Sequence, residues 1–331
     1  MDFVKDMKEK ARSMQKKLVL PEGTEPRTIR AARILVDDEL AASVTLLGKE
    51  SDIREAAEQE GVKLDGINIV NPVSSDKAGA YAGEYYELRK HKGMTPEQAE
   101  ADIADTLRWG AMMVRRGEAD AFVAGAENTT GDVLRAGLTI IGMVKGLKTA
   151  SSCFVMTGLE PSWGKEGSLI LSDCAVVPDP APEQLADIAE SAAQSCREFL
   201  GVEPVVALMS FSTKGSAKHD DVTKVQNAVE ILKSRNPGFV FDGELQADAA
   251  LVPSVTDKKA PGSPVRGLVN TLIFPDLGAG NIGYKLVQRL GKADAFGPFL
   301  QGFAKPISDL SRGASVEDIV VTCAVTLSRV K

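Results

Sequence analysis

The residues best suited to group-transfer chemistry lie near the C-terminus. Ser311-Arg312-Gly313 places a hydroxyl, a guanidinium and a permissive backbone side by side, and the carboxylate of Asp318 follows in the same segment. Such groups stabilise an oxyanion, neutralise a phosphate and accept a proton, which acyl or phosphoryl transfer requires. A structural interpretation stays open, because Ser315 with Asp318 three residues later is also the pattern of a capping box.

A second polar cluster follows an expected strand end in the middle of the chain. It runs Ser210-Phe211-Ser212-Thr213-Lys214-Gly215-Ser216-Ala217-Lys218. Backbone N–H groups, hydroxyls and ammonium groups together suit phosphate oxygens, so Ser212, Thr213, Lys214 and Gly215 are candidate phosphate ligands. The spacing is not that of a Walker loop. A solvated polar turn that opens a helix is the alternative.

The segment Gly278-Ala279-Gly280-Asn281-Ile282-Gly283 has the spacing of a dinucleotide fingerprint. A nicotinamide site also needs an acidic residue about 20 positions later, at the end of a second strand. A helix is expected in that interval, and Asp294 comes too early. The sequence therefore favours a tight loop whose glycines allow close approach. An NAD-dependent dehydrogenase stays an alternative.

Composition excludes several classes of protein. The two histidines, His91 and His219, leave little room for histidine-based triads or metal clusters. The four cysteines form no C-x-x-C pair, so neither a disulfide scaffold nor a metal site is expected. A protein of this kind is expected in a reducing cytoplasm. A net charge of −7 disfavours nucleic acid as a partner. No apolar run approaches the roughly 18 residues of a membrane span.

Short β-branched runs alternate with longer segments of helical period, which predicts parallel βαβ units and an α/β fold. At about 150 residues per domain, the 331 residues indicate two domains. Strands are predicted over 17–20, 42–47, 67–70, 119–124, 152–156, 169–171, 205–209 and 265–274. Helices are predicted over 1–17, 95 to about 117, 183–200, 222–232, 281–290 and 315–331. The polar loop 125–131 follows a strand, where open α/β sheets place ligands.

Motifs along nearly the whole chain resemble those of the phosphate acetyltransferase (phosphotransacetylase) family. Each motif is modest alone, but their common order is specific. They are Leu20-Pro21-Glu22, Tyr86-Glu87-Leu88-Arg89-Lys90-His91-Lys92-Gly93, Ser212-Thr213-Lys214-Gly215-Ser216-Ala217, Asp242-Gly243-Glu244-Leu245-Gln246-Ala247-Asp248-Ala249-Ala250, Lys259-Ala260-Pro261-Gly262-Ser263-Pro264, Phe274-Pro275-Asp276-Leu277 and Lys305-Pro306-Ile307-Ser308-Asp309-Leu310-Ser311-Arg312-Gly313.

The resemblance implies reversible acetyl transfer between acetyl phosphate and coenzyme A. It implies two αβα domains with mainly parallel sheets, like those of isocitrate and isopropylmalate dehydrogenases, with the active-site cleft between them. Domain I is expected over residues 1–148 plus 298–331, and domain II over 149–297. A homodimer is implied as well. Coenzyme A or acetyl-CoA is the expected substrate, with no tightly bound cofactor and no membrane partner.

The resemblance also carries roles to matching positions. Ser311 and Arg312 match the family's catalytic serine and arginine, and Asp318 matches its catalytic aspartate, which would act as a general base. Arg89 and Arg135 match arginines implicated in coenzyme A binding.

Weaker matches concern the phosphate. Arg27 is a weaker match at the first strand end, and Asn128 and Thr129 lie in the loop expected to contact acetyl phosphate. Where many relatives have a histidine, this chain has Asn128, which cannot carry charge.

Three further alternatives stay open. An acetyl-cysteine intermediate on Cys153 or Cys174 lacks a histidine nearby in the sequence. Butyryl or propionyl transfer would use the same chemistry with a different pocket. A metabolite sensor without activity is suggested by Asn128, but the presence of Ser311, Arg312 and Asp318 argues against it.

Overall fold

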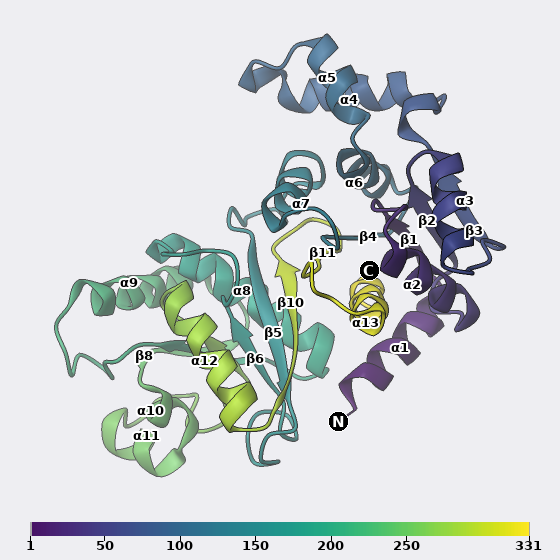
Figure 1. Cartoon of the computed structure of the whole chain (residues 1–331). Coiled ribbons are helices and arrows are strands. Elements are labelled where there is room, and N and C mark those ends of the chain that lie inside the picture. The colour runs from purple at the N-terminus through teal and green to yellow at the C-terminus, as the bar shows by residue number, and fades with distance from the viewer. Residues whose placement is uncertain (1, 331) are drawn as a thin grey trace. The chain divides into compact units, whose positions relative to one another are not determined.

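The structure is a computed structural model that describes residues 2–330 (Figure 1). The chain forms two compact units. The terminal unit comprises Asp2–Val144 and the segment from Phe303 onward, and the middle unit comprises Lys145–Gly302. Each unit is built around its own sheet.

The terminal unit has a five-stranded parallel sheet in the order β11-β4-β1-β2-β3. The strands β1, β2 and β4 are almost entirely buried, as expected for strands covered on both faces. The last strand, β11, comes from the C-terminal segment and pairs with β4. The bounds are β1 Lys17–Leu20, β2 Ser43–Leu47, β3 Ile67–Val70, β4 Ala121–Ala124 and β11 Ile307–Asp309.

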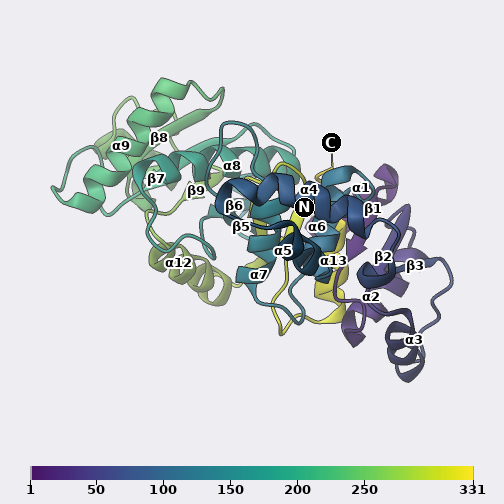
Figure 2. The ribbon, with the colours of Figure 1, turned by 90° about the horizontal axis from the view of Figure 1, so that it is seen from above.

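Helices cover both faces of this sheet. On one face α13 packs against α1 and α2, so the first and the last helix of the chain lie side by side (Figures 1 and 2). On the other face α6 packs against Phe122 of β4, and Gly110 provides the close contact. The bounds are α1 Phe3–Met14, α2 Pro26–Asp37, α3 Glu50–Gln59, α4 Ala78–Arg89, α5 Pro96–Ile103, α6 Thr106–Arg116, α7 Thr130–Ala136 and α13 Val316–Leu327, with short helices η1 Pro72–Ser74, η2 Lys90–Lys92 and η3 Gly137–Ile141.

The single helix predicted from residue 95 to about 117 is wrong, because the structure has α5 and α6 there. The Thr95 capping box at its start is confirmed. The break occurs at Asp105, whose side chain accepts the N–H of Arg108 at 3.0 Å and caps a new helix. An aspartate that bonds the backbone locally competes with helix continuation.

The middle unit has a six-stranded mixed sheet in the order β10-β5-β6-β9-β7-β8. The strands β6, β9, β7 and β8 run parallel, while β5 is antiparallel to both of its neighbours. The helix α8 packs on one side and α12 contacts β5, β6 and β10. The bounds are β5 Ser151–Thr157, β6 Leu169–Ser172, β7 Val205–Met209, β8 Val240–Leu245, β9 Thr271–Ile273, β10 Asp294–Gln301, α8 Pro182–Leu200, α9 Asp220–Arg235, α10 Ala247–Leu251, α11 Pro253–Lys259 and α12 Leu277–Leu290.

The predicted strand over 265–274 is confirmed only at its end, as β9. A turn in which Leu268 donates its N–H to the carbonyl of Val265 occupies the earlier part. Within residues 2–330, no helix is both long and apolar enough to cross a membrane.

Candidate active site

Three loops leave the same edge of the terminal sheet: two carry predicted site residues, and the third leads into Arg27 at the start of α2. The strands β1, β4 and β11 are adjacent and parallel, with Leu18 opposite Ala121 and Asp309 opposite Ala124. Their carboxyl ends therefore point the same way, as at ligand sites of open α/β sheets. The loops that follow are 21–25, 125–129 and 310–315.

Arg27 joins these loops. Its Nη1 donates to the carbonyl oxygens of Arg312 and Ala314, both at 2.8 Å, and its Nη2 donates to the carbonyl of Ala126 at 3.0 Å. Its Nε donates to Glu25 Oε1 at 2.6 Å. Four of the five N–H groups of this guanidinium are therefore used within the protein. Arg27, which was predicted to bind phosphate, therefore connects the three loops through hydrogen bonds.

Ser311 and Arg312 are exposed and lie in a tight turn. The Ser311 hydroxyl accepts the N–H of Gly313 at 3.2 Å, and its carbonyl accepts the N–H of Ala314 at 2.9 Å. Most arginines of residues 2–330 have an ion-pair partner, whereas the guanidinium of Arg312 has none in that part of the chain. It is available to an anion from outside the protein.

Asp318 lies in the first turn of α13 and forms the predicted capping box. Its Oδ2 accepts the N–H and the hydroxyl of Ser315, both at 2.8 Å, and its own N–H donates to that hydroxyl at 3.1 Å. The residue is exposed. Its Oδ1 has no hydrogen-bond partner among the described residues. The structural interpretation is therefore confirmed, and one carboxylate oxygen is still open to a proton.

Asn128 and Thr129 are already bonded within the terminal unit. The Asn128 amide donates to Glu22 Oε1 at 2.9 Å. The Thr129 hydroxyl donates to Asp132 Oδ2 at 2.7 Å, and Thr129 caps α7. A phosphate would have to replace these contacts.

Asp309, at the end of β11, is a buried carboxyl that sequence reasoning missed. Thr130 donates its hydroxyl to Oδ2 at 2.5 Å, and Oδ1 has no hydrogen-bond partner among the described residues. Burial raises the pKa of Asp309 to about 6, the nearby Glu22 carboxylate adds to this, and the Thr130 bond opposes it. Gly125 has a φ of +114°, and a Cβ there would lie 2.4 Å from Asp309 Oδ1, so only glycine fits.

The two arginines expected at coenzyme A differ in their surroundings. Arg89 ends α4 and has no ion pair within residues 2–330. Arg135 lies in the last turn of α7, is largely exposed and pairs with Asp132 at 2.9 Å. Both belong to the terminal unit.

In the middle unit, the loop Ser212–Gly215 is held by two acidic residues of β8. Glu244 accepts the Ser212 hydroxyl at 2.9 Å and the Gly215 N–H at 2.7 Å. Lys214 donates to the Asp242 carboxylate and to the Gly243 carbonyl. Burial raises the pKa of Glu244, but these hydrogen bonds outweigh it and the pKa lies below its usual value. The donors expected to hold phosphate are thus occupied by the protein.

The Gly278–Gly283 segment lies inside α12, so the expected tight loop is wrong. The helix begins at Leu277, capped by Asp276. A Cβ on Gly280 would lie 2.1 Å from the carbonyl oxygen of Asp173, which shows that this glycine permits close packing of α12 on the end of β6. Gly280 of the motif is therefore explained by the close approach of α12 to the backbone at Asp173, and not by a loop that precedes the helix.

The cysteines offer no accessible nucleophile. Cys153 and Cys174 are fully buried. Burial raises the pKa of the Cys174 thiol far above its usual value, which opposes thiolate formation. The geometry therefore disfavours the acetyl-cysteine alternative.

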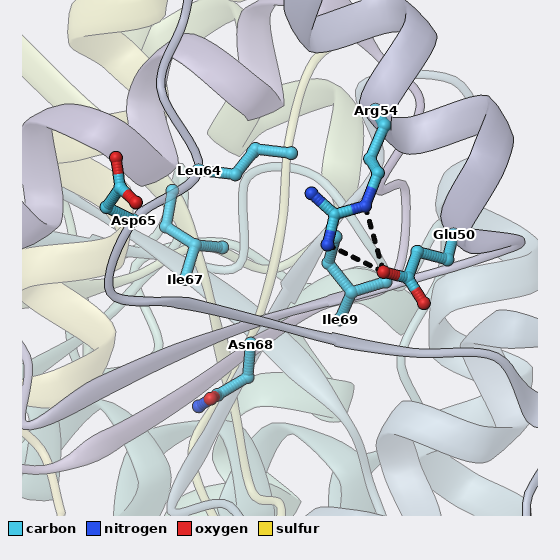
Figure 3. A pocket seen from close by; sticks show the side chains of 7 residues that line it. All are labelled: Glu50, Arg54, Leu64, Asp65, Ile67, Asn68 and Ile69. Carbon is cyan, nitrogen blue, oxygen red and sulfur yellow. Dashed lines mark hydrogen bonds and ion pairs between the residues drawn. The ribbon is translucent and has the colours of Figure 1, made fainter.

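A hollow of about 390 Å³ lies beside the edge strand β3 (Figure 3). None of the predicted site residues lines it, and its Arg54 is bound by Glu50 at 2.6 Å. Its lining residues are Glu50, Arg54, Leu64, Asp65, Ile67, Asn68 and Ile69.

Comparisons with known proteins agree along the whole chain. Residues 2–327 match the sequence family described as phosphate acetyl/butaryl transferase. The phosphate acetyltransferase of Treponema pallidum (strain Nichols) is 58% identical over 330 residues, covering 99% of this chain and 98% of the relative. A phosphotransacetylase from Streptococcus pyogenes superposes with a TM-score of 0.92 at 39% identity, covering 99% and 98% of the two chains.

A more distant likeness concerns the fold alone. A putative 4-hydroxythreonine-4-phosphate dehydrogenase from Salmonella typhimurium has a TM-score of 0.54 at 13% identity, covering 95% of this chain and 99% of that chain. The expected dehydrogenase-like α/β fold is confirmed.

Proposed function

The chain belongs to the family of phosphate acetyl and butyryl transferases, and from this premise we propose which residues carry its reaction. It is an acyltransferase that moves an acetyl group between coenzyme A and phosphate. Coenzyme A is therefore a substrate. The observation that supports the residue assignment is the exposed turn with Ser311 and the unpaired guanidinium of Arg312, in the same segment as the open carboxylate oxygen of Asp318.

In the proposed mechanism, Asp318 removes the proton from the coenzyme A thiol as the sulfur attacks the acetyl carbonyl. A thiol of pKa about 8.5 is only a few per cent ionised at neutral pH, so a base is useful. The new C–S bond forms, the carbonyl electrons move to oxygen, and the oxyanion is stabilised by the Ser311 hydroxyl and nearby N–H groups. Collapse breaks the bond from the acetyl carbon to the phosphate oxygen. Arg312 neutralises the departing phosphate.

We assign the phosphate to Arg312 because the other candidates are engaged. The donors of Ser212–Gly215 are bonded to Glu244 and Asp242. The guanidinium of Arg27 is bonded to three carbonyls and Glu25.

The function is tested by arsenate-dependent breakdown of acetyl-CoA and by comparing acyl phosphates. With coenzyme A at saturation, we expect kcat/KM to be highest for acetyl phosphate and lower for propionyl and butyryl phosphate. A preference for butyryl phosphate would show that the enzyme transfers the longer butyryl group instead of acetyl. Absence of arsenolysis in folded protein would support the sensor alternative.

Arg89 and Arg135 are proposed to bind the anionic groups of coenzyme A. We expect Arg89→Gln to raise the KM for coenzyme A about tenfold with kcat nearly unchanged, because a charge-assisted bond to the bound substrate is lost without change at the reacting atoms. The effect of Arg135→Gln should be smaller, since Arg135 must first leave Asp132. Steady-state kinetics measure both values. An unchanged KM in both variants would remove these arginines from the site.

We further propose a homodimer formed through α12. Ile282, Leu286 and Leu290 recur every four residues and are 61%, 52% and 79% exposed, a single apolar stripe on the helix. Burial of such a stripe against a second copy removes apolar surface from water. Leu286→Glu should convert the dimer to a monomer in light scattering after size exclusion, and the exposed Leu138→Glu of the terminal unit is the control. A wild-type chain that elutes as a monomer would contradict the proposal.

The enzyme is also proposed to lie in the cytoplasm and to hold no tightly bound cofactor. Four cysteines without a C-x-x-C pair are typical of a reducing compartment. Cell fractionation, and mass spectrometry of the purified protein under native conditions, check the two statements.

A further inference from the structure

The buried carboxylate of Glu22, directly after β1, has no role in the reaction as proposed so far. Its side chain is almost completely buried. Four consecutive backbone N–H groups of the loop after β4 donate to it, and so does one side-chain amide. The donors are the N–H groups of Gly125 at 3.1 and 3.0 Å to the two oxygens, Ala126 at 2.8 Å, Glu127 at 3.0 Å and Asn128 at 2.8 Å, with Asn128 Nδ2 at 2.9 Å.

Successive N–H groups that converge on one point form a nest for an anion. At the carboxyl edge of a parallel sheet such a nest usually receives a ligand anion. Here an internal carboxylate fills it, and hydrogen bonds to an ionised acceptor are about twice as strong as neutral ones. The loop is therefore held in one conformation before any substrate binds.

We propose that Glu22 is a positioning residue, an internal anion that sets the loop Gly125–Asn128 and through it the turn with Ser311 and Arg312. The connection is Arg27, which donates to the carbonyl of Ala126 on one side and to those of Arg312 and Ala314 on the other. Displacement of the loop moves the acceptor of Arg27 and thereby the backbone that carries Arg312. The inference rests on the proposed residue assignment, because turnover is one of its two readouts.

A second carboxyl limits the conditions of the test. Asp309 lies on the other side of the loop, receives the hydroxyl of Thr130, and changes charge at a pKa of about 6. Experiments at a constant pH of about 7.5 keep Asp309 ionised, so that its charge does not change between conditions. Chloride at equal ionic strength is the control for general salt effects, because it lacks the two carboxylate oxygens of formate.

The decisive variant is Glu22→Ala, which empties the nest and leaves its N–H donors. We expect kcat to fall about tenfold or more while the KM for coenzyme A changes little. Formate, a small carboxylate, should restore turnover in a saturable manner and should raise the melting temperature of the variant, since it binds the folded state. Chloride should do neither. The wild type, whose nest is full, should not respond to formate.

Two further variants complete the design. In Glu22→Gln the amide fills the space but presents N–H groups to those of Gly125 and Ala126, so turnover should fall and formate should not restore it. Glu58→Ala removes an exposed carboxylate of α3 that takes no part in the nest and should behave as wild type. Circular dichroism verifies folding of each variant.

The outcomes separate the two proposals. Stabilisation of Glu22→Ala by formate without any turnover in the wild type would support the nest and contradict the proposed function. Normal kcat in Glu22→Ala, or a loss of turnover and stability that formate does not reverse, would overturn the role of Glu22. If Glu22→Ala fails to fold, Glu22→Gln decides, and unchanged kcat there would overturn the role equally.

Discussion

Asp318→Asn is expected to lower kcat by about 10²–10⁴-fold with little change in the KM for coenzyme A, because the general base is lost while binding is retained. Asparagine keeps a carbonyl oxygen that can accept the Ser315 N–H, so the helix cap should largely survive. The variant thus separates the catalytic role from the capping role. Steady-state assays of acetyl-CoA formation measure kcat. The melting temperature in thermal unfolding shows whether the helix cap is retained.

Glu317→Gln is the matched control for this variant. Glu317 is an exposed carboxylate in the same helical turn, where it pairs with Lys8 at 2.7 Å. We expect wild-type turnover from it. If folded Asp318→Asn turned over near the wild-type rate, or if Glu317→Gln lost as much activity, Asp318 would not be the base.

Arg312→Gln should lower kcat by about 10²–10³-fold, because charge that develops on the leaving phosphate would lose its guanidinium partner. The KM for phosphate in the reverse reaction should rise as well, since the ground state carries the same anion. Arg312→Lys should recover only part of the rate, because an ammonium keeps the charge but not the planar fork. Kinetics in both directions give these values.

Arg54→Gln serves as its control. Arg54 is exposed in the same unit but is bound by Glu50 at 2.6 Å, and the same loss of charge there should leave kcat unchanged. Equal losses in Arg54→Gln and Arg312→Gln would show a general charge effect and remove Arg312 from the reaction.

The elements that follow a simple periodicity are predictable from the sequence. The predicted strands 17–20, 67–70 and 205–209 coincide with β1, β3 and β7. By contrast, β10 contains Gly297 and Pro298 at an irregular register, and β8 contains Asp242-Gly243-Glu244 in its middle. Glycine, proline and acidic residues are depleted in strands, so pattern reasoning passes over them. Only pairing with β5 and β7 makes these segments strands.

For the candidate site, the sequence indicated which residues could take part better than it indicated the groups to which their side chains are hydrogen-bonded. The capping box of Ser315 and Asp318 involves residues three positions apart, so it was readable directly. The positions of Glu22 and Asp309 relative to the loop at Gly125 depend on strand order, which a linear pattern does not contain. The motif Leu20-Pro21-Glu22 marked the segment without indicating what the carboxylate bonds.

The sequence by itself indicated the family and the reaction, and it named Ser311, Arg312 and Asp318 as candidate catalytic residues, because motifs depend on local order along the chain. Only the tertiary structure showed that Arg27 donates hydrogen bonds to carbonyls of two distant loops and that Lys214 is bound by Asp242. A charged side chain near a strand end looks the same in sequence whether it awaits a ligand or is satisfied internally. Which of the two holds depends on donors and acceptors that folding brings from distant segments.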